Sequence, residues 1–380
     1  MLPGPNRDRI SIADVLPSCL DAVRGEENRI GLKPAHRAVV VLVDGLGAAA
    51  LRARAGHARV LGAALAAGGT IDSVFPTTTA TALTTLATGA PPGQHGMVGY
   101  SVLDPANARV VNQLSGWDDR LDPETWQREP TLFERAAGSG LAAVAVGPAR
   151  YRDSGFTRAA LRGAEYRAAG SIAERFAAAE AWLREPGPPG ILYLYVPELD
   201  VVAHASGWES PEWTEQLELV DASVRDLVSR LRAADGVLLT ADHGVVDVPA
   251  RSHILIDSAP ELVAGVRFVA GEPRCLQLHF EPGLSAAARV ALVDRWRESE
   301  SDRSWVVTRA EAIAADWFGS VASEVEPRIG DLLVAARKNV AYYDGRTASP
   351  RSLAMVGQHG SWSAAELQVP LLRFGAFAAG

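Results

Sequence analysis

The sequence predicts an α/β fold in which helices flank a central, mostly parallel sheet, with a small α+β insertion added to it. Short runs rich in Val, Ile, Leu and Tyr alternate with longer helical patterns along most of the 380 residues, as in parallel βαβ units. The rhythm changes at 259–322, where strand-like runs flank one helical pattern. Apolar residues make up 48% and charged residues 22% of the chain, which is typical of a globular protein.

The first half of the chain alternates between the two element types. The run 38–43 is wholly apolar and predicts a buried strand, and the helical pattern after it ends at Gly68 and Gly69. Thr131 and Glu134 have the spacing of a capping box, as do Ser171 and Glu174, so each pair predicts the start of a helix. The expected strands are 38–43, 70–75 and 141–147, and the expected helices are 51–67 and one that begins inside the threonine-rich stretch 77–88.

The second half continues the alternation around the insertion. Ser210 followed by Pro211 predicts the start of a long amphipathic helix. The expected elements are strands at 191–196 and 236–240, then strand-like runs at 266–280, a helix at 285–298 and a strand at 304–308 in the insertion, then a further core strand within 329–337. We therefore predict a core of residues 36–258 and 323–380, an insertion or cap of residues 259–322, and an N-terminal extension of residues 1–35.

Charge and composition exclude several classes of function. The net charge of −8 disfavours binding to a nucleic-acid polymer. Two cysteines are too few for a disulfide framework. No run approaches the ~20 apolar residues of a membrane helix. The first 20 residues lack the basic and apolar regions of a secretory signal, so we predict a cytoplasmic protein with no membrane partner.

Aspartate and histidine residues follow several of the predicted strands. The carboxyl ends of parallel strands meet at one edge of a sheet, where ligands bind. Mixed Asp and His ligands suit divalent transition metals, and six of them suit two ions. The six residues are Asp44, Asp200, His204, Asp242, His243 and His359.

Three threonines offer a nucleophile near this edge. Thr77, Thr78 and Thr79 lie where a strand gives way to a helix, so backbone N–H groups and the helix dipole favour an anion there. A threonine hydroxyl beside a divalent metal becomes a usable nucleophile. The pattern alone leaves open which of the three has this role, and each also suits a turn or a helix cap.

The order of the motifs VDGLG, FPTTTATALTTLATGAPPGQHGMVGY, D-x-x-x-H, ADHG and GQHGS…VPLL resembles that of the alkaline phosphatase superfamily, in particular its nucleotide pyrophosphatase/phosphodiesterase branch. The resemblance runs from about residue 38 to the end, apart from the insertion. It implies an alkaline-phosphatase-like core. It also implies that the nucleophilic threonine lies ten residues before Gly89, which selects Thr79.

The resemblance further implies a role for each of the six ligands. Asp44, Asp242 and His243 would hold one metal ion, and Asp200, His204 and His359 would hold the other. Zinc is the implied metal, with manganese or iron as alternatives. Tyr100 stands where the family usually has an asparagine that binds a phosphoryl oxygen, so Tyr100 and the nearby Asn112 are the expected substrate-binding residues.

The expected function is hydrolysis of a small phosphate ester or nucleotide by a nucleotide pyrophosphatase/phosphodiesterase, through a covalent phospho-threonine intermediate. The alternatives are a phosphomonoesterase or a phosphonate hydrolase with the same site, an isomerase that moves a phosphate within a sugar, and a catalytically silent nucleotide-binding protein. The tryptophans in predicted loops offer stacking surfaces for a base. The sequence predicts no oligomeric state.

Overall fold

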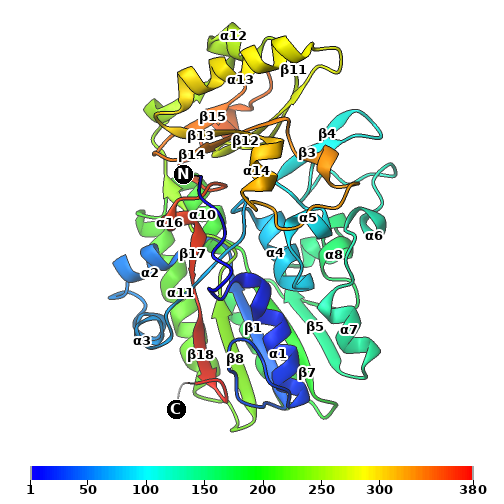
Figure 1. Ribbon diagram of the computed structural model, residues 1–380. Helices are drawn as coiled ribbons and strands as arrows, with labels where there is room; N and C mark the ends of the chain where they lie inside the picture. The colour runs from blue at the N-terminus through cyan, green and yellow to red at the C-terminus, as the bar shows by residue number, and fades with distance from the viewer. Residues whose placement is uncertain (1, 379–380) are drawn as a thin grey trace.

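Two β-sheets organise the computed structural model, which describes residues 2–378. In Figure 1 the larger sheet lies at the bottom of the molecule and the smaller one at the top. The larger sheet consists of β1 (Arg37–Val43), β5 (Ala142–Gly147), β6 (Glu165–Ala168), β7 (Gly190–Val196), β8 (Asp235–Thr240) and β18 (Leu372–Gly375). Its strand order is β18-β8-β1-β7-β5-β6. All neighbours are parallel except β18 and β8, so the predicted fold class is confirmed.

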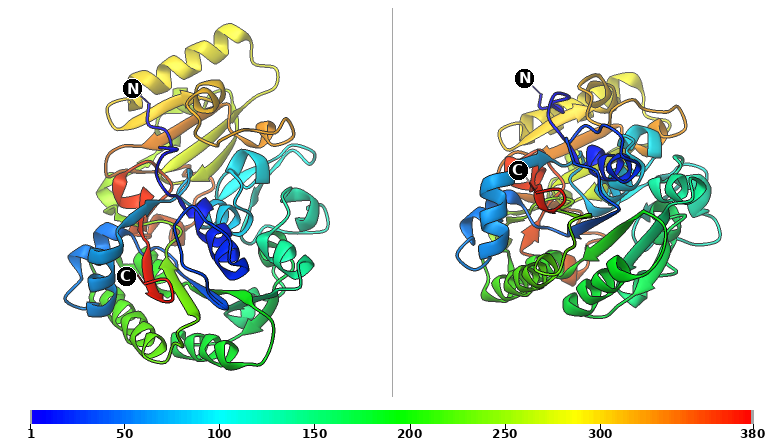
Figure 2. Two further views of the ribbon diagram at one scale, coloured as in Figure 1. Left: turned by 60° about the horizontal axis from the view of Figure 1, so that its bottom comes forward. Right: turned by 90° about the horizontal axis from the view of Figure 1, so that it is seen from below.

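Helices cover both faces of the larger sheet (Figure 2). One face carries α1, which packs on β1 and β7, together with α4 and α7, and the other carries α9 and α11. The helices of this part are α1 (Val15–Arg24), α2 (Ala48–Ala53), α3 (Arg59–Gly68), α4 (Thr79–Thr88), α5 (Pro92–His95), α6 (Pro123–Trp126), α7 (Leu132–Gly138), α8 (Gly155–Ala160), α9 (Ile172–Arg184), α10 (Glu198–Ser206), α11 (Pro211–Val228), α15 (Pro350–Leu353) and α16 (Ala364–Leu367). Short 3₁₀ helices lie at Ile12–Asp14, Ala149–Tyr151, Ala250–Ser252, Ile256–Ser258 and Glu326–Arg328.

The second sheet is antiparallel throughout and has the order β11-β12-β14-β13. Its elements are β11 (Val266–Glu272), β12 (Cys275–Phe280), β13 (Ser304–Thr308) and β14 (Leu332–Ala336), with α12 (Pro260–Val263), α13 (Ala286–Glu300) and α14 (Arg309–Ala314) beside them. Successive side chains of a strand point to opposite faces of the sheet, and both faces of this second sheet are buried. Leu276 and Leu278 pack with Trp296 of α13, whereas Cys275 and Leu333 face a cluster that contains Phe75. The second sheet is therefore joined to the rest of the molecule through an apolar core.

Four short strand pairs lie outside the two larger sheets. They are β2 (Thr70–Asp72) with β17 (Gln368–Pro370), β3 (Ser101–Asp104) with β4 (Arg109–Asn112), β9 (Val246–Asp247) with β16 (Gly357–Gln358), and β10 (His253–Leu255) with β15 (Ala341–Tyr343). Among residues 2–378, no helix is long and apolar enough to cross a membrane. The cytoplasmic location stays a prediction.

Most predicted elements occur, and three expectations were wrong. The predicted helix at 51–67 is split into α2 and α3, and the predicted strand at 70–75 is only β2, which lies outside the larger sheet. The strand within 329–337 is β14, which pairs with β12 and β13 in the second sheet instead of the core. An apolar strand buried on both faces has the same sequence pattern in either sheet. The second sheet therefore extends past residue 322, while the domain boundaries themselves stay a prediction.

Candidate metal centre and active site

The six predicted ligands meet at the carboxyl end of the larger sheet. β1 and its two neighbours, β7 and β8, supply most of them because parallel strands end at the same edge. The ligands are Asp44 directly after β1, Asp200 and His204 on α10 directly after β7, Asp242 and His243 directly after β8, and His359 directly after β16. The sequence prediction that these distant residues lie close together is therefore met.

Asp44, Asp242 and His243 form a first group, all of them buried. The Nε2 atom of His243 lies 3.5 Å from an Asp44 oxygen and 3.4 Å from an Asp242 oxygen. The other Asp242 oxygen accepts hydrogen bonds from the backbone N–H groups of Gly45 (3.1 Å) and His243 (2.9 Å). Gly45 has a φ of 74°, and a Cβ there would approach the Asp200 backbone to 3.1 Å. A glycine after Asp44 thus lets α10 come close to β1.

Asp200 is the centre of a second group. One of its oxygens lies 3.2 Å from His204 Nε2, and the other lies 3.8 Å from His359 Nε2. The rings of His204 and His359 are 5.2 Å apart, and those of His243 and His359 stack at 3.6 Å. The ligand atoms of Asp200, His359 and His243 lie within 4.8 Å of one another, as do those of the first group. His243 thus stands between the two groups, while His204 contacts Asp200 from one side.

All three histidines have the same orientation. Each directs Nδ1 to a backbone carbonyl and Nε2 to the aspartates. Because a carbonyl only accepts hydrogen bonds, Nδ1 carries a proton, so in the neutral imidazole Nε2 has the lone pair that can bind a metal. The Nδ1 contacts are His204 to Gly357 at 2.8 Å, His359 to Thr77 at 2.8 Å and His243 to Gly244 at 3.1 Å.

The charges of the site also fit divalent cations. Asp44, Asp200 and Asp242 each have one buried carboxylate oxygen without a hydrogen-bond partner among the described residues. Burial raises the pKa of the Asp44 carboxyl, and repulsion from Asp242 and Asp200 raises it further. Three carboxylates in one desolvated site are unfavourable without a compensating positive charge. The donor set of carboxylate oxygens and imidazole nitrogens therefore fits divalent metal ions.

Thr79 is the one of the three threonines that faces this site. It is the first residue of α4, and its hydroxyl lies 3.2 Å from His243 Nε2. The Thr77 hydroxyl instead donates to the Ser361 carbonyl and accepts from the Gly360 N–H. Thr78 is the N-cap residue of α4 and is fully buried. Thr79 therefore lies at the N-terminus of a ten-residue helix, and the free N–H groups of the first turn favour an anion there.

A cavity opens beside Thr79. Its walls are mostly apolar and aromatic, and none of the residues that line it is charged. They include Thr79, Leu83, Tyr151, Phe156, Tyr193 and Tyr195. The five tryptophans that the sequence offered for stacking, Trp117, Trp126, Trp208, Trp213 and Trp362, do not line it.

Tyr195 joins this cavity to the ligands. Its hydroxyl donates a hydrogen bond to Asp44, and its ring stacks on Tyr193 at 6.2 Å. Burial and the charge of Asp44 raise the pKa of the Tyr195 phenol. Tyr195 therefore stays protonated and orients Asp44. The sequence analysis did not predict a role for Tyr195. The available signal was a pair of tyrosines at alternate positions of a buried strand, which place two hydroxyl groups on the same face of the sheet.

The two predicted substrate-binding residues lie outside the cavity lining. Tyr100 is exposed, with 41% of its surface accessible. The Asn112 side-chain carbonyl accepts hydrogen bonds from the backbone of Leu114 and Ser115 (2.9 and 3.0 Å), which closes a local turn. Only Leu114 of this segment reaches the cavity. A substrate role for Tyr100 and Asn112 stays a prediction.

Glu272, at the end of β11, is a buried carboxyl close to the site. Both of its oxygens lack a hydrogen-bond partner among the described residues, and a Cβ on Gly360 would lie 2.4 Å from its Cγ. Burial raises the pKa of Glu272 to about 8, and Glu366 acts in the same direction, whereas the nearby Thr78 hydroxyl and Tyr100 amide act to lower it. Glu272 is therefore largely protonated at neutral pH.

Glu272 should make the stability of the protein depend on pH. A carboxyl whose pKa is raised by folding stabilises the fold most below its unfolded pKa of about 4.3, and this contribution is lost as the pH rises through about 8. We expect Tm to fall from about pH 6 to about pH 9 more steeply in the wild type than in Glu272→Gln. Glu300→Gln is the matched control, because Glu300 is equally buried but its pKa is lowered. Parallel Tm curves for wild type and Glu272→Gln would contradict the assignment.

Fold and site together define a metal-binding α/β protein with a threonine hydroxyl at a buried cluster of aspartates and histidines. Residues 38–362 match the sequence profile described as type I phosphodiesterase / nucleotide pyrophosphatase. The chain belongs to this family of hydrolases, and the resemblance noted from its motifs is confirmed.

Several known proteins are similar to the chain. An uncharacterized pyrophosphatase/phosphodiesterase of Schizosaccharomyces pombe is 26% identical over 200 residues, 50% of this chain and 40% of that protein. The chain thus matches less than half the length of this curated relative. Murine ectonucleotide pyrophosphatase/phosphodiesterase 5 is 17% identical with a TM-score of 0.68, over 89% of this chain and 88% of that one. Phosphonoacetate hydrolase from Sinorhizobium meliloti 1021 is 21% identical with a TM-score of 0.66, over 90% and 91%. These two structures show a shared fold.

Proposed function

We propose that the chain hydrolyses phosphodiesters or nucleotide pyrophosphates in two steps, through a phosphorylated Thr79. The observation that carries this proposal is the position of the Thr79 hydroxyl. It lies at the N-terminus of α4 and 3.2 Å from His243 Nε2, and Thr79 lines a cavity without charged residues. An inactive threonine-to-alanine variant of murine ectonucleotide pyrophosphatase/phosphodiesterase 5 has been solved in complex with AMP. That structure supports a threonine nucleophile and a nucleotide substrate for this chain.

The ligand set supports two divalent metal ions. Asp44, Asp242 and His243 would hold one, and Asp200, His204 and His359 the other. When bound, such ions lower the pKa of a nearby hydroxyl and neutralise charge on phosphoryl oxygens. Three nitrogen and three carboxylate ligands favour zinc, and manganese or iron also fits them. Metal analysis of protein purified without chelator tests this assignment, which predicts about two ions per chain.

The residues of the chain have separate roles in the proposed reaction. Thr79 Oγ1 forms a bond to phosphorus while the bond to the leaving oxygen breaks, and the Thr79 hydroxyl proton passes through solvent to that leaving oxygen. Backbone N–H groups of α4 donate to the non-bridging oxygens, and Tyr195 holds Asp44 in place. Water then forms a bond to phosphorus as the bond to Thr79 Oγ1 breaks, which restores the hydroxyl and releases the product.

The lining of the cavity favours one of the candidate substrates over the others. None of its lining residues is cationic, so it suits a neutral, flat group attached to phosphorus better than a carboxylate. The likeness to phosphonoacetate hydrolase keeps phosphonate hydrolysis as the second candidate. This order of substrate preference is tested by comparing the hydrolysis rates of bis-p-nitrophenyl phosphate, p-nitrophenyl phosphate and phosphonoacetate. We expect the aryl diester to be the preferred substrate, and a preference for phosphonoacetate or the monoester would replace the proposal.

Tyr151 should stack on an aryl group that stays on phosphorus during the first step. It lines the cavity, and its ring lies 6.0 Å from that of Tyr195. Since base stacking is worth ~1–3 kcal/mol, we expect Tyr151→Ala to raise KM for bis-p-nitrophenyl phosphate by roughly tenfold. KM for methyl p-nitrophenyl phosphate should stay unchanged. Tyr100→Ala is the comparison outside the cavity, and an equal effect there would instead support the role predicted for Tyr100.

A further inference from the structure

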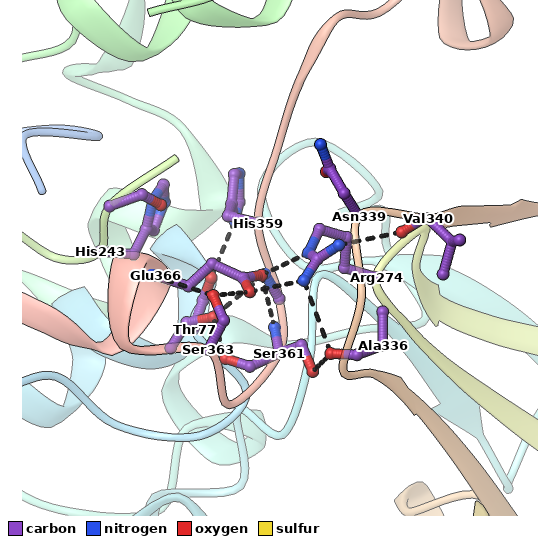
Figure 3. A network of polar contacts seen from close by, with 12 residues as sticks. Thr77, His243, Arg274, Ala336, Asn339, Val340, His359, Ser361, Ser363 and Glu366 are labelled. Carbon is purple, nitrogen blue, oxygen red and sulfur yellow. Dashed lines mark hydrogen bonds and ion pairs between the residues drawn. The ribbon is translucent and has the colours of Figure 1, made fainter. Parts of the chain in front are cut away.

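A buried ion pair joins the second sheet to the loops of the metal centre (Figure 3). Arg274 lies in the turn between β11 and β12, and its guanidinium donates to both carboxylate oxygens of Glu366, at 2.7 and 2.8 Å. Only 2% of the Arg274 side chain and none of that of Glu366 are exposed. The remaining Arg274 donors bind the carbonyls of Lys338, Val340 and Ala336 at 3.0, 2.9 and 3.5 Å. The guanidinium is therefore fixed on all sides by the protein.

Glu366 contacts the two loops that carry metal-binding histidines. One carboxylate oxygen accepts a hydrogen bond from the Ser361 N–H at 2.9 Å, two residues after His359. Its backbone carbonyl accepts a hydrogen bond from the Gly244 N–H at 2.8 Å, one residue after His243. A single glutamate thus holds both loops, and Arg274 holds that glutamate.

The spacing between these loops sets the geometry of the centre. The rings of His243 and His359 stack at 3.6 Å with an interplanar angle of 15°. A Cβ on Gly244 would lie 2.0 Å from the Ala365 carbonyl, so its loop packs directly against the segment that leads to Glu366. A small displacement of Glu366 would therefore move both histidines.

The same contacts reach the threonine turn. Thr77 accepts a hydrogen bond from the Gly360 N–H at 3.0 Å and donates to the Ser361 carbonyl at 2.9 Å. Its own carbonyl accepts from His359 Nδ1 at 2.8 Å. The His359 loop thus positions both a ligand and the residues that precede Thr79.

We propose that Arg274 is a positioning residue of the metal centre, which acts through Glu366 to fix the separation of the His243 and His359 loops. The second sheet then positions the metal-binding loops through Arg274, in addition to packing on the core. This inference rests on the metal ligands of the proposed function and is independent of the substrate. Lysine cannot replace Arg274, because it lacks the planar fork that binds both oxygens of Glu366.

Titration of the metal-free protein with Co²⁺, followed by its visible absorption, tests the proposal. Loss of a residue that orients metal ligands typically weakens metal binding by about 10- to 100-fold, and we expect this for at least one Co²⁺ in Arg274→Lys, with a changed spectrum. Arg303→Lys is the matched control, since Arg303 donates to both Glu300 oxygens at 2.7 and 2.8 Å but contacts neither loop. It should bind Co²⁺ like the wild type.

Wild-type Co²⁺ affinity and spectrum in Arg274→Lys would overturn the proposal, even if its Tm fell, because the arginine would then contribute only to stability. Glu366→Gln is the second variant in case Arg274→Lys does not fold. Glutamine keeps a side-chain acceptor for the Ser361 N–H and the backbone carbonyl that binds the Gly244 N–H, but it loses the negative charge that pairs with Arg274. We therefore expect weaker Co²⁺ binding in Glu366→Gln as well. Unchanged Co²⁺ binding in this variant would overturn the proposal. A wild-type protein that bound no Co²⁺ would contradict the metal centre itself.

Discussion

Thr79→Ala is expected to lower kcat for bis-p-nitrophenyl phosphate by at least about 10³-fold, as loss of a covalent nucleophile does. Among residues 2–378, only Thr79 both lines the cavity and has a hydroxyl within hydrogen-bond distance of His243. Metal content and Tm should stay close to those of the wild type, because alanine is also a good first residue of α4. Steady-state kinetics on metal-loaded protein measures the effect.

Two further variants separate the nucleophile from its neighbours. Thr79→Ser keeps a hydroxyl and should retain measurable turnover. Thr78→Ala removes a hydroxyl that makes no cap hydrogen bond, and this variant should retain most of the turnover. Retention of wild-type kcat by Thr79→Ala would show that the hydroxyl is not the nucleophile. A loss in Thr78→Ala as large as that in Thr79→Ala would assign the effect to the turn as a whole.

Asp242→Asn is the second change with a large expected effect. The Asp242 oxygen that accepts from Gly45 and His243 has a counterpart in the asparagine carbonyl, while the unpartnered oxygen becomes an NH₂ group that cannot bind a cation. We expect the bound metal to fall from about two ions to about one and kcat to fall by at least about 10³-fold. Metal analysis after dialysis, together with kinetics, measures both.

Asp235→Asn is the matched control for this substitution. Asp235 is also buried, but it lies at the opposite end of β8 and pairs with Arg232. Its replacement should leave the metal content unchanged. Without metal, Asp242→Asn should be at least as stable as the wild type, since it removes one charge that repels Asp44. A metal-free Asp242→Asn protein with a much lower Tm would mean that Asp242 mainly stabilises the fold.

Local patterns predicted four of the six strands of the larger sheet, whereas β6 and β18 were not predicted. β1, β5, β7 and β8 are short apolar runs, each separated from the next by helical segments, and such runs become parallel strands buried on both faces. The capping boxes at Thr131 and Ser171 open α7 and α9 as predicted. These features depend on residues close together in the sequence.

Strand pairing between distant segments was not predictable in the same way. β14 has the apolar composition of a core strand, yet it lies between β12 and β13 of the second sheet. Its partners are set by packing against α13 on one face and against the Phe75 cluster on the other. The local pattern of an apolar run does not indicate which sheet such a strand joins.

The candidate site likewise contains some residues that local patterns predicted and others that only the fold places there. Its aspartates and histidines were found because each follows a strand or belongs to a recognisable motif. Arg274 and Glu272 escaped notice because they are charged residues in a predicted insertion, where solvent exposure is the ordinary expectation. Only the fold reveals that the turn between β11 and β12 lies beneath the loop that carries His359.

The stereochemical course at phosphorus tests the two-step reaction through Thr79 most directly. A phosphorothioate diester of known configuration is hydrolysed in ¹⁸O-labelled water by the metal-loaded enzyme, and the configuration of the product is determined. Each in-line displacement inverts phosphorus, so attack by Thr79 followed by attack by water predicts overall retention. Overall inversion would mean that water attacks the substrate directly, and it would contradict the phospho-threonine intermediate.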